Sequence, residues 1–426
     1  MMTQLPSSPL PLPVAQTLAL HCQGLTPALE STPAPTPDVI YDVVHRLTCV
    51  QIDTLHVVQR SQYVTLWSRL GTYDPADFDR LIYDPVQRRL FEYWKHAASI
   101  IPLEDYRYRQ HMMEGYKNGG GWWPDWAKEP ENRDLIQAVH ARIRDEGPLR
   151  TSDFKHDQEQ GGSWWNWKPA KRALEHLYNG GDLMIGDRVH FQRVYDLRER
   201  VLPDWVDTSL PTLEDTHRHE LDRAARALGI ATTGQVADYL HARRGDMYPT
   251  LDAMLADGTL HEVQVTCATG AASGGADGEV RDFVVHRDTL PLLEQAADGA
   301  IQARRTTFLS PFDSLFWAND RDQQLWNYRK TLECYKPAPQ REWGYFCLPI
   351  LHREQLVGRF DPKMERKTGT LRLKALYLEP GTAPTDDLIA GTAAAMRDFM
   401  AFHNATDLVI EASDPAEYGQ RLLAAL

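Results

Sequence analysis

The sequence lacks several features that would assign a class of protein at once. No apolar run in the 426 residues reaches the ~18 that a membrane helix needs. The first residues have neither the basic start nor the apolar core of a signal peptide. The five cysteines are scattered without a Cys-x-x-Cys pair, so neither a zinc site nor a disulfide framework is predicted. We therefore expect a cytoplasmic protein that spans no membrane and holds no metal.

Positive charge is also scarce. The net charge of −13 argues against a protein that binds nucleic acid by charge alone, because that affinity comes from Lys and Arg. Basic residues do cluster locally, at Arg88-Arg89, at Lys168 with Lys171-Arg172, at Arg243-Arg244, and at Lys363 with Arg366-Lys367. Each cluster alone is typical of a solvated surface. Together they indicate a binding surface only if the fold brings them to one side.

The composition is otherwise that of a globular protein, with 42% hydrophobic and 25% charged residues. The length predicts two to four domains of about 100–200 residues. Residues 1–13 are rich in Pro and Ser and are predicted to be disordered.

One short run, residues 49–55, combines apolar and polar residues in alternation. Gln51 and Asp53 stand between Val50, Ile52 and Leu55. In an extended segment, residues two apart face the same side. An amide that can hold a water and a carboxylate that can activate it would then point together. A second interpretation is that Asp53 caps a helix over residues 54–70.

Helical patterns followed by hairpins recur along the chain. Patterns at 14–22, 38–47 and 58–70 precede two predicted strands within 86–105, which is typical of a winged helix-turn-helix. Two later segments share one spacing, in which Leu174, Leu177, Gly181 and Leu183 correspond to Leu251, Met254, Gly258 and Leu260. Helix, C-terminal glycine and strand at identical spacing predict two further units of this kind.

After residue 304 the pattern changes to alternating strands. Segments 343–351, 355–361 and 370–378 predict an antiparallel sheet or small barrel, followed by a helix at 384–403 and a strand at 408–410. The predicted fold class is α+β, with three tandem winged helix-turn-helix units and a C-terminal β-rich, barrel-like domain. The boundaries are 1–13 (disordered), 14–129 (first unit, with a Gly/Trp loop), 130–205, 206–300 and 301–426.

Longer motifs occur in a fixed order. They are VQIDT at 50–54 with Tyr63 and LWSR at 66–69, WWNWKPAKRALE at 164–175, residues 191–202, LSPFD at 309–313 with Trp317, and GYF at 344–346 with LVGR at 356–359. In this order they resemble the YcaQ/AlkZ-like family of winged-helix DNA glycosylases over nearly all of the chain. Gln51 and Asp53 match the Gln-x-Asp branch of the family's catalytic motif.

The resemblance implies three winged helices around a C-shaped channel, and a monomer that acts on double-stranded DNA. The implied reaction is excision of N7-alkylated guanine, including unhooking of interstrand crosslinks, without a metal or other cofactor. The residues expected to contact DNA are Arg60, Arg69, Lys168, Lys171, Arg172, Arg243 and Arg244.

The chemistry of this reaction suits the two polar residues. N7-alkylguanine is cationic and leaves readily, and its departure turns the sugar into an oxocarbenium ion. Asp53 would stabilise that cation and take a proton from the attacking water, which Gln51 would orient. The motif contains no Lys, so we expect a monofunctional hydrolase. Because a crosslinked base cannot easily leave the duplex, we expect an open site rather than a tight base-flipping pocket.

Two other classes of protein fit the same pattern. A winged-helix transcription regulator would bind a palindromic site as a dimer and would need neither Gln51 nor Asp53. An architectural or interaction protein would use the repeated units only as a scaffold. Release of free 7-methylguanine from methylated DNA separates the glycosylase from both.

Overall fold

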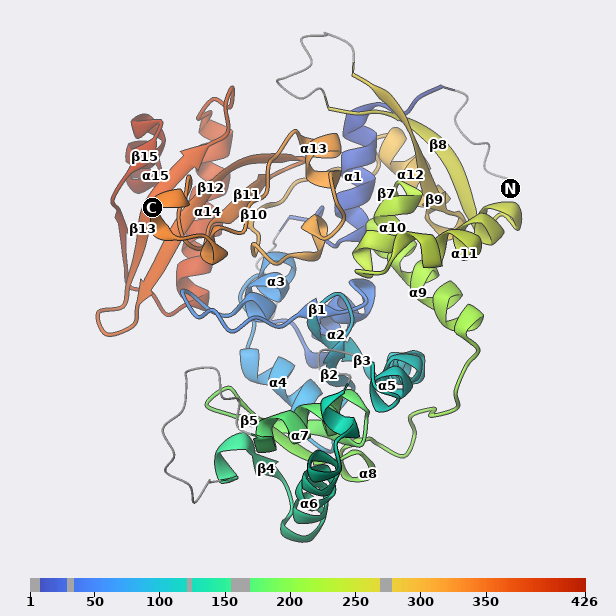
Figure 1. Ribbon diagram of the computed structural model, residues 1–426. Coiled ribbons are helices and arrows are strands. Elements are labelled where there is room, and N and C mark those ends of the chain that lie inside the picture. Colours follow the sequence, from blue (N-terminus) through green and yellow to red (C-terminus); the bar gives the residue numbers. More distant parts are fainter. Residues whose placement is uncertain (1–7, 29–33, 121–124, 155–168, 269–277) are drawn as a thin grey trace. The chain divides into compact units, whose positions relative to one another are not determined.

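The structure is a computed structural model that describes residues 8–28, 34–120, 125–154, 169–268 and 278–426 (Figure 1). The chain forms two compact units. The first contains Met1–Pro75, Lys95–Ser99 and His217–Leu426, and the second contains Ala76–Trp94 and Ile100–Thr216. No helix in these described ranges is both long enough and apolar enough to cross a membrane.

The first unit opens with α1 (Leu12–Cys22), α2 (Pro37–Arg46), β1 (Val50–Gln51) and α3 (Ser61–Leu70). Helix α3 begins later than the predicted residue 58 and ends at Gly71, whose φ of 73° is the left-handed conformation that favours glycine. The predicted hairpin within 86–105 is confirmed as β2 (Leu90–Trp94) and β3 (Ala98–Pro102). Its tip, Lys95–Ser99, belongs to the first unit.

The second unit is mainly helical, with one further small sheet. Its elements are α4 (Pro75–Tyr83), η1 (Leu103–Arg109), α5 (Gln110–Lys117), η2 (Trp126–Lys128), α6 (Pro130–Glu146), β4 (Leu149–Arg150), η3 (Thr151–Asp153), α7 (Pro169–Asn179), β5 (Leu183–Val189), β6 (Gln192–Leu197) and α8 (Arg198–Val201). The sheet has the order β4-β6-β5. His190 and Phe191 form the turn before β6, with φ of 51° and 66°.

The chain returns to the first unit through a helical segment with its own sheet. The elements are α9 (Leu213–Leu228), β7 (Ile230–Ala231), α10 (Thr233–Tyr239), α11 (Arg244–Ala256), β8 (Leu260–Thr266), β9 (Val280–His286), η4 (Arg287–Thr289) and α12 (Leu290–Ala297). The sheet has the order β7-β9-β8. Helix α10 starts at a capping box, in which Thr232 accepts the Gln235 N–H and Gln235 accepts the Thr232 N–H.

The predicted repeat appears in both segments. Helix α7 ends before Gly181 (φ 78°) and strand β5, and α11 ends before Gly258 (φ 73°) and β8. In each sheet the last strand lies between the other two. Residues 268–279 are rich in Gly and Ala, and this composition predicts that they form the tip of the last wing. Of these residues, 269–277 lie outside the described part of the chain.

The C-terminal part is a curled, half-barrel sheet covered by helix α14 (Figure 1). Its strands are β10 (Thr306–Phe308), β11 (Leu348–His352), β12 (Gln355–Glu365), β13 (Thr370–Leu378) and β14 (Asp407–Ile410), in that order, with β15 (Ser413–Asp414) beside β13. The helices are η5 (Ser314–Phe316), α13 (Arg321–Trp326), η6 (Glu333–Tyr335), η7 (Ala338–Gln340), α14 (Asp386–Phe402) and α15 (Ala416–Ala425). The first predicted strand begins at residue 348 rather than 343.

An aromatic cluster attaches α3 to this sheet. Trp67 of α3 is fully buried, and its ring centroid lies 5.9 Å from that of Phe308 and 4.9 Å from that of Phe399. Phe402 lies 6.4 Å away on the same helix as Phe399. Aromatic rings of this size contribute much of the burial that holds elements together. The helix that follows the Gln51–Asp53 run is therefore fixed to the C-terminal sheet.

The N-terminal segment differs from the prediction in two ways. Residues 1–7 lie outside the described ranges, but the Leu10 N–H bonds the Gln264 carbonyl at 2.7 Å, and α1 begins at Leu12. The predicted disorder is therefore wrong for residues 8–13. Helix α1 was assigned to the first winged unit, yet its buried residues share a core with Ile230 and Val285 of the β7-β9-β8 segment. The apolar residues of a helix predict that it is buried, but they do not indicate which segment of the chain it packs against.

Candidate active site

Gln51 and Asp53 alternate with two buried residues in a short extended segment. Val50 and Ile52 are buried, whereas Gln51 and Asp53 are each half-buried. The Ile52 N–H donates to the Ala98 carbonyl at 2.8 Å, which holds the segment against the hairpin tip. The predicted alternation of apolar and polar positions is confirmed.

Asp53 is not a helix cap. Helix α3 begins eight residues further on, at Ser61 after Arg60, and has no side-chain cap. Asp53 Oδ1 instead accepts the Leu55 N–H at 2.7 Å, which forms a local turn. Its own N–H reaches Gln62 Oε1 at 3.4 Å. The second interpretation of this run, a helix over residues 54–70, is therefore wrong.

The loop after Asp53 is held by the C-terminal sheet. The Met364 N–H on β12 donates to the Val57 carbonyl at 3.1 Å. The Arg366 guanidinium, just beyond β12, donates to the Val58 carbonyl at 2.7 Å. A non-helical loop needs such partners for its backbone groups when it is partly buried. The position of Asp53 thus depends on contacts more than 300 residues away in the chain.

The charge of Asp53 has little compensation. Burial raises the pKa of the Asp53 carboxyl above its ordinary value, and the N–H groups of Leu55 and Thr54 only partly offset this. Within the described ranges no Lys or Arg acts on this pKa. The Gln51 amide has no hydrogen-bond partner among the residues that the structure describes. A free amide beside an uncompensated carboxylate can hold a water and face a cation.

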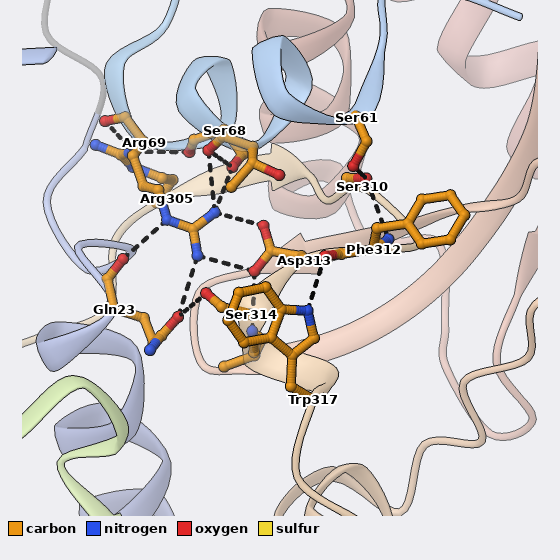
Figure 2. A network of polar contacts seen from close by, with 12 residues as sticks. Gln23, Ser61, Ser68, Arg69, Arg305, Ser310, Phe312, Asp313, Ser314 and Trp317 are labelled. Carbon is orange, nitrogen blue, oxygen red and sulfur yellow. Dashed lines mark hydrogen bonds and ion pairs between the residues drawn. The ribbon is translucent and has the colours of Figure 1, made fainter. Parts of the chain in front are cut away.

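A buried polar network lies between α3 and the LSPFD segment (Figure 2). Arg69 forms a two-pronged ion pair with Asp313, with Nη2 to Oδ1 at 2.9 Å, and both side chains are at most 1% exposed. Arg69 also donates to the Gln23 backbone carbonyl at 3.0 Å. Ser61 Oγ and Ser310 Oγ are 2.7 Å apart at the other end of α3. Both ends of α3 are therefore tied to residues 310–313.

This network corrects one predicted DNA contact. Arg69 was expected to bind DNA, but its guanidinium is buried and already engaged by Asp313, Gln23, Thr65 and Ser68. Breaking such a pair to reach a phosphate would leave Asp313 as a buried, unpaired charge. Arg69 is therefore a structural residue that positions α3.

The other predicted DNA-binding residues stay predictions. Lys168 lies outside the described ranges. Arg60 is half-buried at the start of α3, and Lys171 and Arg172 are half-buried in the first turn of α7. Lys171 lies 3.6 Å from Glu175. Arg243 is exposed, whereas Arg244 is exposed and pairs with Asp238 at 2.6 Å.

Two further residues, Cys334 and Tyr335, interact with Asp53, and no sequence motif indicated them. Burial raises the pKa values of the Cys334 thiol and the Tyr335 hydroxyl, and the Asp53 charge raises both further. Both residues therefore lie within electrostatic reach of Asp53. No spacing in the sequence signals this, because η6 belongs to a segment without periodicity.

The fold is similar to that of a solved DNA glycosylase. The chain is similar to a solved structure of Streptomyces sahachiroi DNA glycosylase AlkZ, with a TM-score of 0.61 and 16% sequence identity. The match covers 95% of this chain and 100% of the AlkZ chain. At that identity the similarity shows the fold alone.

The sequence match shows the family. The model of the family described as DNA glycosylase AlkZ-like matches residues 44–402, which include both Gln51 and Asp53. The chain belongs to this family of DNA glycosylases, as the sequence motifs had predicted.

Proposed function

We propose that this protein hydrolyses the N-glycosidic bond of N7-alkylated guanine in double-stranded DNA, including guanines joined in interstrand crosslinks. The observation that carries the proposal is the half-buried Asp53 carboxylate, on which no Lys or Arg of the described residues acts. A negative charge of this kind suits a substrate and transition state that are cationic. The neighbouring Gln51 amide adds a group that can orient water.

The proposed steps use these two side chains. The C1′–N9 bond breaks, its electron pair goes to the base, and the alkylguanine leaves as a neutral molecule. Asp53 stabilises the positive charge that develops on the sugar. A water oriented by Gln51 attacks C1′, and Asp53 takes its proton. The products are a free alkylguanine and an abasic site, without a covalent enzyme intermediate, so the enzyme is monofunctional.

Three segments of the chain each combine helices with a small sheet, and this arrangement supports binding of DNA by winged helix-turn-helix units. We assign α2, α3 and the β2–β3 hairpin, the α6–β6 segment and the α9–β9 segment as winged helix-turn-helix units, with the C-terminal sheet as a fourth domain. Arg60, Lys171, Arg172, Arg243 and Arg244, with Lys168, are the proposed phosphate contacts of a monomer.

The function is tested by incubating the protein with a duplex that contains 7-methylguanine and measuring free base by chromatography. A second duplex with a defined guanine–guanine crosslink is resolved on a denaturing gel. We expect free 7-methylguanine and separated strands. If the protein instead binds a palindrome symmetrically and releases no base, it is a winged-helix regulator and the proposal is wrong.

Replacing both Lys171 and Arg172 with Ala should weaken DNA binding to the same degree for every sequence. Two lost phosphate contacts should reduce the slope of log affinity against log salt by about 2. The measurement is fluorescence anisotropy at several salt concentrations. Arg397→Ala with Arg421→Ala removes the same charge from α14 and α15 as a control. An unchanged slope in the Lys171/Arg172 variant would mean that the first turn of α7 does not contact DNA.

The excision rate should depend on the protonation of Asp53. Since burial raises the pKa of this carboxyl, activity should be lost as the pH falls through a value above that of an exposed Asp. The test is the single-turnover rate between about pH 4 and pH 8, corrected for spontaneous base loss, with circular dichroism at each pH to confirm folding. A rate that is constant down to the pKa of an exposed Asp would contradict this assignment.

A further inference from the structure

A buried carboxylate fixes the loop that carries Tyr335. The Glu333 side chain is 1% exposed and accepts backbone N–H groups from Glu342 at 3.0 Å, Trp343 at 2.7 Å and Gly344 at 3.2 Å. Lys336 adds an ion pair at 3.0 Å. Burial works against the charged form, but these N–H groups hold the pKa of Glu333 at about 2. Glu333 is therefore ionised at neutral pH and clamps residues 333–344 into one loop.

Tyr335 projects from this clamped loop. It is 70% exposed, which is unusual for an aromatic side chain on a segment held so firmly. Its ring packs against that of Phe312 in a T-shaped arrangement, with the centroids 6.4 Å apart and an angle of 73° between the ring planes. Phe312 is itself buried and lies 6.3 Å from Phe346. The ring is thus supported from one side and open on the other.

A chain of short contacts connects the open ring to the proposed catalytic carboxylate. The Asp53 N–H lies 3.4 Å from Gln62 Oε1, and the hydroxyl oxygen of the adjacent Ser61 lies 2.7 Å from that of Ser310. Ser310 Oγ accepts the Phe312 N–H at 3.1 Å, and the Phe312 ring packs against Tyr335. The Asp53 charge also raises the pKa of the Tyr335 hydroxyl. A flat cation is attracted both to an aromatic face and to an unpaired carboxylate. An aromatic face and a carboxylate near one another would therefore favour N7-alkylguanine over guanine, because only the alkylated base is positively charged.

We propose that Tyr335 is the stacking platform for the cationic base, while Asp53 faces the sugar. This inference rests on the proposed function and adds a residue that determines specificity. The cation is attracted to the ring before cleavage, and the neutral base that leaves is attracted less. The same side chain would therefore select the charged lesion and release the product.

The test measures binding, so that it does not depend on turnover. The probe is a duplex with one 7-methyl-2′-fluoro-2′-deoxyguanosine, whose fluorine destabilises the oxocarbenium ion and so slows cleavage. The reference is the same duplex with guanine. The ratio of the two dissociation constants is determined for the wild type, Tyr335→Ala and Tyr335→Phe. Trp205→Ala is the control, because it removes an aromatic side chain that is 57% exposed in the second unit.

Tyr335→Ala should reduce the preference for the cationic duplex about tenfold, whereas Tyr335→Phe keeps the ring and should stay within about twofold of the wild type. Affinity for the undamaged duplex and the melting temperature should not change. An unaltered preference in Tyr335→Ala overturns the inference. So does an equal loss in Tyr335→Phe, which would assign the role to the hydroxyl. Failure of the wild type to excise 7-methylguanine would instead refute the proposed function, and it is read in a separate assay.

Discussion

Excision of 7-methylguanine should fall by about two to four orders of magnitude when Asp53 is replaced with Asn. The substitution keeps the size of the side chain and the oxygen that accepts the Leu55 N–H, but it removes the negative charge. Affinity for undamaged DNA should be nearly unchanged, because the proposed role of Asp53 concerns the positive charge of the lesion and of the transition state. The measurement is the single-turnover rate of base release, with DNA affinity measured beside it.

The same variant should not be less stable than the wild type. The pKa of Asp53 is raised in the folded state, so ionisation of this carboxyl opposes folding above that pKa. Asn has no charge to bury, and the melting temperature should therefore stay the same or rise. A variant that loses activity while keeping its melting temperature separates catalysis from folding. A variant that excises at the wild-type rate would refute the mechanism.

Gln51→Ala should lose less activity than Asp53→Asn, because orienting a water supplies a smaller share of the barrier. The two changes together should cost less than the sum of their separate effects, since both residues act on one water. Additive losses in the double variant would indicate that Gln51 acts on another step, such as contact with the base.

Asp313→Ala should destabilise the protein by about 3–5 kcal/mol. The change leaves the Arg69 guanidinium buried without its carboxylate, and it also removes the acceptor for the Leu315 N–H. Urea unfolding followed by tryptophan fluorescence and by circular dichroism measures the effect. Because α3 is tied to residues 310–313 by this pair, the first unit should be the part that unfolds earlier.

Two variants test this interpretation of the ion pair. Asp386→Ala removes a fully exposed carboxylate that pairs with Arg421, and it should leave stability nearly unchanged. Arg69→Met with Asp313→Leu removes both buried charges and should be more stable than Asp313→Ala alone. If Asp313→Ala unfolds at the same urea concentration as the wild type, Arg69 is accommodated in another way and the network does not hold α3.

Local patterns were sufficient to predict several parts of this protein. The alternation around Gln51 and Asp53 predicted two polar side chains on one side of an extended segment, because the period of two is a property of the backbone alone. The spacing shared by Leu174–Leu183 and Leu251–Leu260 predicted two equivalent helix–glycine–strand segments. Gly181 and Gly258 have the positive φ that such a helix end requires.

Other features were decided only by tertiary contacts. Arg69 was predicted to contact DNA, but its guanidinium is buried in an ion pair with Asp313, which lies 244 residues further along the chain. Asp53 followed by Thr54 had the signature of a helix cap, but β12 holds the next residues in a loop instead. The position of Tyr335, the proposed stacking platform, is likewise fixed by the Glu333 clamp and by Phe312. Periodicity is set by neighbours in the chain, whereas burial and the pairing of charges depend on which distant segments meet. For that reason the sequence alone was sufficient to propose Gln51 and Asp53 as a catalytic pair, but not to predict the residues that surround them.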